Sequence, residues 1–372
     1  MTIYVKEMPT FTVQTIRPLV NDSIKVYPLI STADVRYNDF IIVSRFDSAP
    51  LVSSVYNHVI VYESLLEQLS ESISQIYHNN YDYYHLKYAL NNSSNSDIST
   101  VISGSSYGTY GINLSCIDNA INLSSTSQDL YYSTKLIVQA CQNNSNIRNV
   151  VLCVGYYCFH SDLSLTQSLD ELRRLSIVYY PLLHDAHNCL LLPPKTDFCI
   201  QSDIINFESI LDSFISTECQ KGYFNDLHPR SSCAIKTWSD KGKNWSELST
   251  YEQDIAGKVR AEAHNKALNH QASFNENICL FQNFVNFCNN SNINLLVTVT
   301  PATKSYLKHL NREYKNTFYS VLNQIEGTIH LLDLSDEENF DNTIDFNDTD
   351  HLSDSGAAKL SSIISSTLNE IS

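Results

Sequence analysis

Residues 101–111, VISGSSYGTYG, are a short apolar run that leads into a turn bracketed by glycines. The β-branched start predicts a buried strand, and the glycines permit a tight bend after it. Ser106 lies at the tip of this bend, where backbone N–H groups at the start of a following helix point toward an incoming anion. A serine so placed is a candidate nucleophile with an oxyanion site beside it. Glycine–serine runs are also common in ordinary loops, and that is the alternative interpretation.

Strand-like and helix-like segments alternate along the rest of the chain. The predicted strands are residues 98–103, 120–123, 149–154, 293–300 and 328–334, and the predicted helices are 131–142, 274–288, 305–325 and 353–371. The segment 149–154, NVVLCV, is apolar throughout, which is typical of a central parallel strand covered on both faces. The alternation predicts the α/β class: a three-layer α/β/α fold around a central, mostly parallel, five-stranded sheet.

The first 90 residues and the remainder are expected to form separate domains. Residues 1–90 contain β-rich runs broken by prolines, at 3–5, 10–16, 24–30 and 40–43, then helical patterns at 59–77 and 81–90. They predict a small β-rich appendage, built as a hairpin sheet, followed by a helix. Residues 91–372 form the second domain, with a long insertion at about 160–273. Insertions of this size often build a lid or a wall of a substrate site.

Composition excludes several classes of function. The chain has 372 residues, 43% of them hydrophobic, and a formal net charge of −16. Such acidity argues against binding nucleic acid or an anionic membrane surface through bulk charge. Neither a signal peptide nor a run of about 18 apolar residues is seen, so we expect no transmembrane segment. The ten cysteines are scattered without a C-x-x-C pair. We therefore expect a cytoplasmic protein with free thiols.

A second candidate group lies near the carboxyl end, in residues 345–360, DFNDTDHLSDSGAAKL. Asp348 and His351 are three residues apart, a spacing that can put both side chains on one side of a turn. The aspartate would accept the Nδ1–H of the histidine and leave Nε2 free to take a proton from a serine. Ser353 or Asp354 would cap the final helix. An acidic loop can also contain D-x-x-H by chance. However, both candidate groups follow parallel strands, whose carboxyl ends share one edge of the sheet.

Together the Gly-Ser-Ser-Tyr turn and the DxxHLS block at 348–353 resemble the SGNH (GDSL-type) hydrolase superfamily. The resemblance is greatest to its bacterial relatives in polysaccharide and cell-envelope modification, including the D-alanine-transfer and alginate O-acetylation proteins. It covers about residues 98–372 and implies a flavodoxin-like sheet. By position, it implies that Ser106 is the nucleophile, His351 the base and Asp348 the acid that orients it.

Other positions depart from the family pattern. Ser105 stands where the GDS motif has aspartate, a variant also found in the relatives just named. The second block begins at Asn122 and reads NLSSTS. The resemblance implies that Ser105 and Asn122 lie in the oxyanion or substrate-binding site and that the backbone N–H of Ser127 is an oxyanion donor. In the third block Tyr157 replaces the usual asparagine. Losing one oxyanion donor costs about 2.7–4 kcal/mol in the barrier. Either Tyr157 or His160 takes that role, or the chemistry is slow or different; core packing is the alternative for Tyr157.

These observations predict a serine-dependent acyl-ester hydrolase or O-acyl(acetyl)transferase that acts on a carbohydrate in bacterial surface polysaccharide biosynthesis or modification. The expected partner is an acylated or acceptor carbohydrate. No metal or resident cofactor is expected, and a transferase would use acetyl-CoA or another acyl donor as co-substrate. Two alternatives stay open. One is a non-catalytic carbohydrate-binding or assembly protein with a degenerate SGNH fold. The other is a metal-dependent hydrolase, for which the sequence offers no clustered His/Cys/Asp spacing.

Overall fold

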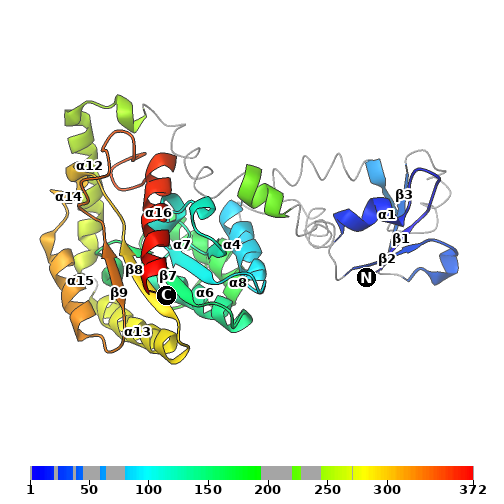
Figure 1. Ribbon diagram of the computed structural model, residues 1–372, viewed down its shortest axis with the longest axis horizontal. Helices are drawn as coiled ribbons and strands as arrows, with labels where there is room; N and C mark the ends of the chain where they lie inside the picture. The colour runs from blue at the N-terminus through cyan, green and yellow to red at the C-terminus, as the bar shows by residue number, and fades with distance from the viewer. Residues whose placement is uncertain are drawn as a thin grey trace. The chain divides into compact units, whose positions relative to one another are not determined.

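The computed structural model describes residues 2–20, 24–36, 39–44, 59–63, 80–193, 220–227, 244–269 and 271–371 (Figure 1). The chain divides into two compact units. Unit 1 comprises Met1–Tyr81 and Lys195–Leu227, and unit 2 comprises Asp82–Pro194 and His228–Ser372. Unit 1 thus includes part of the predicted insertion, and both groups of candidate site residues lie in unit 2.

Unit 2 is built on a five-stranded sheet in which every described pair of neighbouring strands is parallel. The strand order is β6-β5-β7-β8-β9. The strands are β5 (Thr100–Gly104), β6 (Ala120–Asn122), β7 (Asn149–Val154), β8 (Asn294–Val299) and β9 (His330–Asp333). The chain leaves β5 toward β6 on one side and then returns to β7 on the other. The strand order therefore reverses between β5 and β7, and ligands of open α/β sheets bind at the carboxyl edge beside such a reversal.

Helices cover both faces of this sheet, which confirms the predicted three-layer α/β/α fold (Figure 1). The helices that contact it are α5 (Ser106–Gly111), α6 (Leu130–Asn143), α13 (Gln271–Asn290) and α16 (Asp354–Ile371). Strand β7 shows how the layers form. Val150 and Leu152 belong to the cluster with α6 and α13, whereas Val151 and Cys153 belong to the cluster with α16. Successive strand side chains point to opposite faces, so one apolar run supplies both cores.

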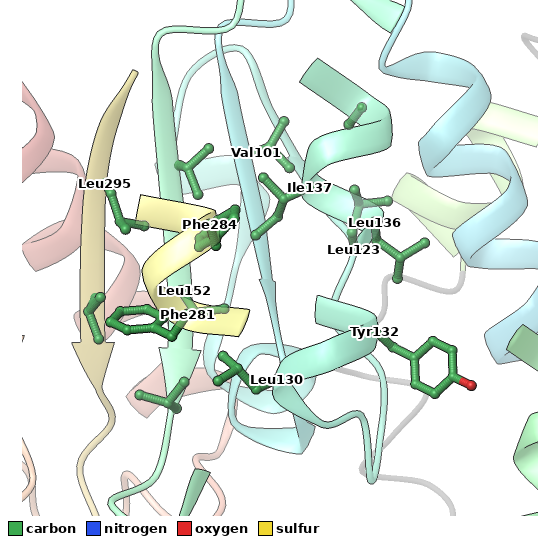
Figure 2. Close-up of a cluster of buried hydrophobic side chains, with 14 of the residues drawn as sticks. Val101, Leu123, Leu130, Tyr132, Leu136, Ile137, Leu152, Phe281, Phe284 and Leu295 are labelled. Atoms are coloured by element: carbon green, nitrogen blue, oxygen red, sulfur yellow. The ribbon is translucent and has the colours of Figure 1, made fainter. Parts of the chain in front are cut away.

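Figure 2 shows the larger core. Ile137 and Phe284, from α6 and α13, lie over the strand residues Val101, Leu152 and Leu295. Each is at most 3% exposed, and complete burial of such a side chain contributes about 1.5–3 kcal/mol. This packing fixes the positions of β5 and β7, whose carboxyl ends carry the candidate site.

Two predicted elements of unit 2 differ from the structure. The helix expected at 305–325 is two helices, α14 (Lys304–Leu307) and α15 (Arg312–Gln324). The break occurs because Asn311 caps α15, its side chain accepting the N–H of Glu313. The predicted insertion also contains several helices: α7 (Leu169–Arg174), α8 (Tyr180–Leu183) and α12 (Thr250–Asn265).

Unit 1 contains a second parallel sheet, in the order β2-β1-β3-β4. Its strands are β1 (Thr2–Val5), β2 (Lys25–Pro28), β3 (Phe40–Val43) and β4 (Val59–Val61). The predicted hairpin sheet is therefore wrong, since hairpins join antiparallel strands. The β-rich run at 10–16 contains a helical turn, α1 (Val13–Ile16), and the predicted helix at 59–77 begins as β4. The β-branched Val59–Val61 run pairs with β3, so tertiary pairing overrides the helical pattern. Residues 64–77 of that prediction lie outside the described residues, whereas 81–90 lies in α4 (Tyr81–Asn92).

No helix in the described part of the chain is long and apolar enough to cross a bilayer. The seven cysteines in the same ranges are free thiols, as predicted.

Candidate active site

The serine turn depends on a glycine at the end of β5. Gly104 has φ +154°, and a Cβ there would lie 2.1 Å from the carbonyl oxygen of Cys153 on the neighbouring strand. Ser105 follows as the N-cap of α5, its hydroxyl accepting the N–H of Tyr107. Ser106, the first residue of α5, is buried. The chain can turn this sharply only because residue 104 lacks a side chain.

Asn122, predicted to bind the substrate or the oxyanion, links the serine helix α5 to the loop after β6. Its Nδ2 donates to the carbonyl of Gly108 at 3.0 Å, and its Oδ1 accepts the N–H of Ser124 at 2.9 Å. Helix α5 and this loop approach each other closely, since a Cβ at Gly108 would lie 2.1 Å from Ser124 Oγ. The structure thus gives Asn122 a role in holding α5.

Ser106, His351 and Asp348 form one hydrogen-bonded row. Ser106 Oγ lies 2.8 Å from His351 Nε2, although the two residues are 245 positions apart. His351 Nδ1 lies 2.8 Å from one carboxylate oxygen of Asp348. The other oxygen accepts the backbone N–H groups of Asp350 and His351. Asp348 therefore holds both the imidazole and the loop that carries it. In this arrangement Nε2 of His351 can accept the proton of the serine hydroxyl.

The charges around His351 favour its protonated form. Burial, which leaves the residue 2% exposed, acts to lower its pKa. The carboxylates of Asp348 and Asp350 outweigh burial, and the pKa of His351 is raised above its ordinary value. An imidazolium formed at this position during reaction is thereby stabilised.

A buried ion pair lies beside the row and was not predicted from sequence. The Asp350 side chain is 0% exposed and accepts Arg260 Nε at both oxygens, at 3.0 and 3.1 Å. Tyr107 donates its hydroxyl to Asp350 at 3.0 Å. Burial would raise the pKa of Asp350, but the charges of His351 and Arg260 hold it well below the ordinary value. Arg260 comes from α12, 90 positions away, and no local pattern indicates such a partner.

The two candidates for the third oxyanion donor have aromatic surroundings. Tyr157 donates its hydroxyl to Tyr107 at 3.3 Å, and its ring lies 4.3 Å from that of His264. Burial raises the pKa of Tyr157 to about 12, so its hydroxyl keeps its proton at neutral pH. The ring of His160 stacks on Phe274 at 4.6 Å. The structure thus places the Tyr157 hydroxyl against Tyr107 and the His160 ring against Phe274.

Ser127 lies in a constrained turn. Its φ is +56°, and the turn is closed by the N–H of Gln128 donating to the carbonyl of Ser125 at 3.1 Å. Gln128 Nε2 also donates to the carbonyl of Gly104, and Arg174 donates to Ser125 Oγ at 2.6 Å. A positive φ is uncommon outside glycine and usually requires support of this kind. Gln128 and Arg174 hold the second-block loop against the end of β5, and sequence reasoning missed both.

A small cavity of about 30 Å³ lies at the reversal point of the sheet. Ser105, Gln128, Gly155 and Tyr157 are among its lining residues, so all three loops compared with the SGNH blocks border it. A space of this size holds only one or two water-sized groups. Its lining includes Ser105, next to Ser106 in the chain.

Among the residues that the structure describes, two groups of side chains place metal-ligating atoms within 4.8 Å of one another, although no metal site was predicted from the sequence. They are Asp348, Asp350 and His351, and Asp129, Asp162 and His187. In the first group Arg260 already pairs with Asp350. In the second, the carboxylate of Asp129 accepts the backbone N–H groups of Tyr132 and Leu163. Protein partners thus engage these carboxylates, and both groups stay candidates for a cation.

No family model matches the chain, and no curated protein matches it.

Proposed function

We propose that the protein is a serine-dependent acyl-ester enzyme of the SGNH type, a hydrolase or O-acyltransferase acting on a carbohydrate. The observation that carries this proposal is the 2.8 Å contact between Ser106 Oγ and His351 Nε2, with Asp348 on the other ring nitrogen. This is the geometry of a nucleophile, a general base and an orienting acid.

In the proposed reaction, Ser106 attacks the ester carbonyl while His351 takes the hydroxyl proton. The backbone N–H groups of Ser106 and Ser127 stabilise the oxyanion. The intermediate collapses as His351 gives its proton to the leaving alcohol, and Ser106 is left acylated. Water or a sugar hydroxyl then attacks the acyl-enzyme, with His351 again taking the proton. The second intermediate collapses as the bond from the acyl carbon to Ser106 Oγ breaks and His351 returns the proton to Ser106, which releases the free acid or the acylated sugar.

Two features bear on the substrate. The cavity of about 30 Å³ favours a small acyl group such as acetyl. The carbohydrate is proposed from the resemblance to polysaccharide-modifying relatives. Hydrolysis and transfer are distinguished by supplying a sugar acceptor with p-nitrophenyl acetate or acetyl-CoA as donor. Transfer gives an acetylated sugar in proportion to acceptor concentration, whereas hydrolysis gives free acetate whatever the acceptor.

The test is turnover of p-nitrophenyl acetate together with labelling by a fluorophosphonate. Wild type and Ser362→Ala, a change on the exposed side of α16, should both react, and Ser106→Ala should not. We expect the variant to lose at least about 10³-fold in kcat, the usual loss when the nucleophile is removed. Equal labelling of Ser106→Ala and wild type would remove Ser106 from the mechanism.

One observation favours the non-catalytic alternative. The third-block position holds Tyr157 in place of asparagine, and its hydroxyl donates to Tyr107. No side-chain amide at this position can therefore donate to an oxyanion. Saturable glycan binding that survives His351→Ala, without esterase activity, would select a binding or assembly protein. The two groups of two aspartates and one histidine make a metal-dependent hydrolase a further alternative, and it can be tested. Activity lost in EDTA and restored by a divalent cation would select it.

A further inference from the structure

Arg260 forms an ion pair with Asp350, the residue that precedes the proposed catalytic histidine in the chain. Only its Nε bonds to Asp350. Within the described residues no acceptor pairs with Nη1 or Nη2, and the side chain is 31% exposed although Asp350 is 0% exposed. A guanidinium has five N–H donors, four of them on these two nitrogens. Arg260 therefore directs its inner edge to a buried carboxylate and leaves its outer edge open to solvent.

Asp350 connects Arg260 to the candidate active site. Asp350 precedes His351 in the chain, and one of its oxygens lies 3.8 Å from His351 Nδ1. The charge of Arg260 acts to lower the pKa of His351, so the two groups are within electrostatic reach.

Helix α12 holds Arg260 in a fixed position. A Cβ at Gly257 would lie 2.2 Å from the carbonyl oxygen of Ser305, so α12 packs directly against the backbone of α14. Asp254, one turn earlier, pairs with Lys308 and His309. Recognition groups on a rigid helix are better placed than groups on a loop.

We propose that the Nη edge of Arg260 binds an oxyanion of the substrate, either the carboxylate of an acidic sugar or the phosphate of an acyl donor. This rests on the proposed function, since it names the substrate class of the same site. The planar fork of arginine fits the two oxygens of a carboxylate or phosphate. Arg260 and Asp350 together are neutral, so recognition comes from directed N–H donors. Lysine, which keeps the charge but loses the fork, does not replace arginine here.

The experiment measures binding without turnover, by calorimetry on full-length Ser106→Ala. The ligands are methyl β-D-glucuronide, methyl β-D-glucoside, inorganic phosphate and adenosine 3′,5′-bisphosphate. We expect one of the anions to bind at least tenfold more tightly than the neutral glucoside. Preference for the glucuronide identifies an acidic sugar, and preference for the phosphate compounds identifies the acyl donor.

Arg260→Lys, added to Ser106→Ala, should reduce this preference at least tenfold. Lys258→Gln, which removes a charge from the same helix, should keep it. Because a single change leaves Asp350 buried without its partner, the double change Arg260→Gln with Asp350→Asn provides a neutral pair. It should fold, by circular dichroism, and also lose the preference. Equal affinity for anions and glucoside, or a preference unchanged by Arg260→Lys, overturns the proposal.

The two proposals fail separately. Anion preference that depends on Arg260, without fluorophosphonate labelling of wild type at Ser106, would keep the anion site and reject the serine enzyme. Labelling at Ser106 without anion preference would do the reverse.

Discussion

His351 has a carboxylate partner on one ring nitrogen and a hydroxyl on the other. In the proposed mechanism only neutral imidazole accepts the serine proton. The charges that raise its pKa therefore set the pH range of activity. They also stabilise the imidazolium that forms when the proton arrives.

The first prediction concerns this pH range. The acid limb of kcat/KM should have its midpoint above about 6.5, the ordinary histidine pKa, because the pKa of His351 is raised. Asp348→Asn removes one of the raising charges, so the limb should move to lower pH. Its plateau should fall by roughly 10³–10⁴-fold, since the tautomer is no longer fixed. Stopped assays with p-nitrophenyl acetate between pH 4 and 9 measure both. An acid limb that stays in place in Asp348→Asn contradicts the assignment.

The second prediction concerns Gly104. Gly104→Ala places a Cβ 2.1 Å from a backbone oxygen at φ +154°. Backbone must move to relieve that contact, so we expect a loss of about 2–4 kcal/mol in the free energy of unfolding. Gly222→Ala is the control, because a Cβ there meets no described residue within 4 Å. Thermal melting followed by circular dichroism compares them. Equal melting temperatures for the two variants would show that the tight turn at residue 104 is not required.

At the scale of elements, α16 begins just after the loop that carries Asp348 and His351. Ser353 is its N-cap, accepting the N–H of Gly356 at 3.3 Å and donating to the carbonyl of Ile344 at 2.6 Å. Leu360 and Ile364 then bury one side of the helix against the sheet. The packed helix thus fixes the end of the loop that carries Asp348 and His351, and the Ser353 cap joins this loop to the helix.

The third prediction tests this cap. Ser353→Ala should cost about 1 kcal/mol of stability, the usual value for a lost N-cap side chain. Ser362→Ala, on the exposed side of the same helix, should stay within about 0.5 kcal/mol of wild type. Urea unfolding measures both. Should Ser353→Ala prove as stable as Ser362→Ala, the cap does not hold the loop.

Helix α12 shows how an insertion can contribute to a site. The predicted role of residues 160–273 was a lid or substrate wall. The structure places Arg260 of this insertion on Asp350, next to His351. In the two proposals made above, Arg260 of the insertion binds the substrate anion, while Ser106, His351 and Asp348 perform the reaction.

At the scale of the whole molecule, each unit has its own parallel sheet. All the described residues of the candidate site belong to unit 2. The seven described cysteines, spread over that unit, are free thiols.

The fourth prediction follows from those thiols. Dithiothreitol should leave the melting temperature unchanged within about 1 °C, because loss of a structural disulfide would cost about 2–5 kcal/mol and lower it by several degrees. Thiol titration in denaturant should find at least the seven described cysteines reduced. A clear drop in melting temperature on reduction would show that disulfides stabilise the protein.

The sequence by itself determined the layered α/β fold of unit 2. Uninterrupted apolar runs such as Asn149–Val154 can be satisfied only by burial on both faces, and they alternate with amphipathic helical segments. It also determined the spacing of Asp348 and His351 and limited the cap of the last helix to Ser353 or Asp354, because these contacts span three residues or fewer.

Unit 1 was predicted less well. A short β-rich run does not indicate whether it pairs with the next strand in the sequence or with a more distant one, nor in which direction. The strands predicted to form hairpins are in fact parallel. Only tertiary structure decided that Ser106 meets His351, that Arg260 meets Asp350, and that Gln128 and Arg174 hold the turn at Ser127. The physical reason is that local propensity and periodicity describe neighbours along the chain. Contacts across 90 or 245 positions depend on how the packed helices and sheet bring distant loops to one edge.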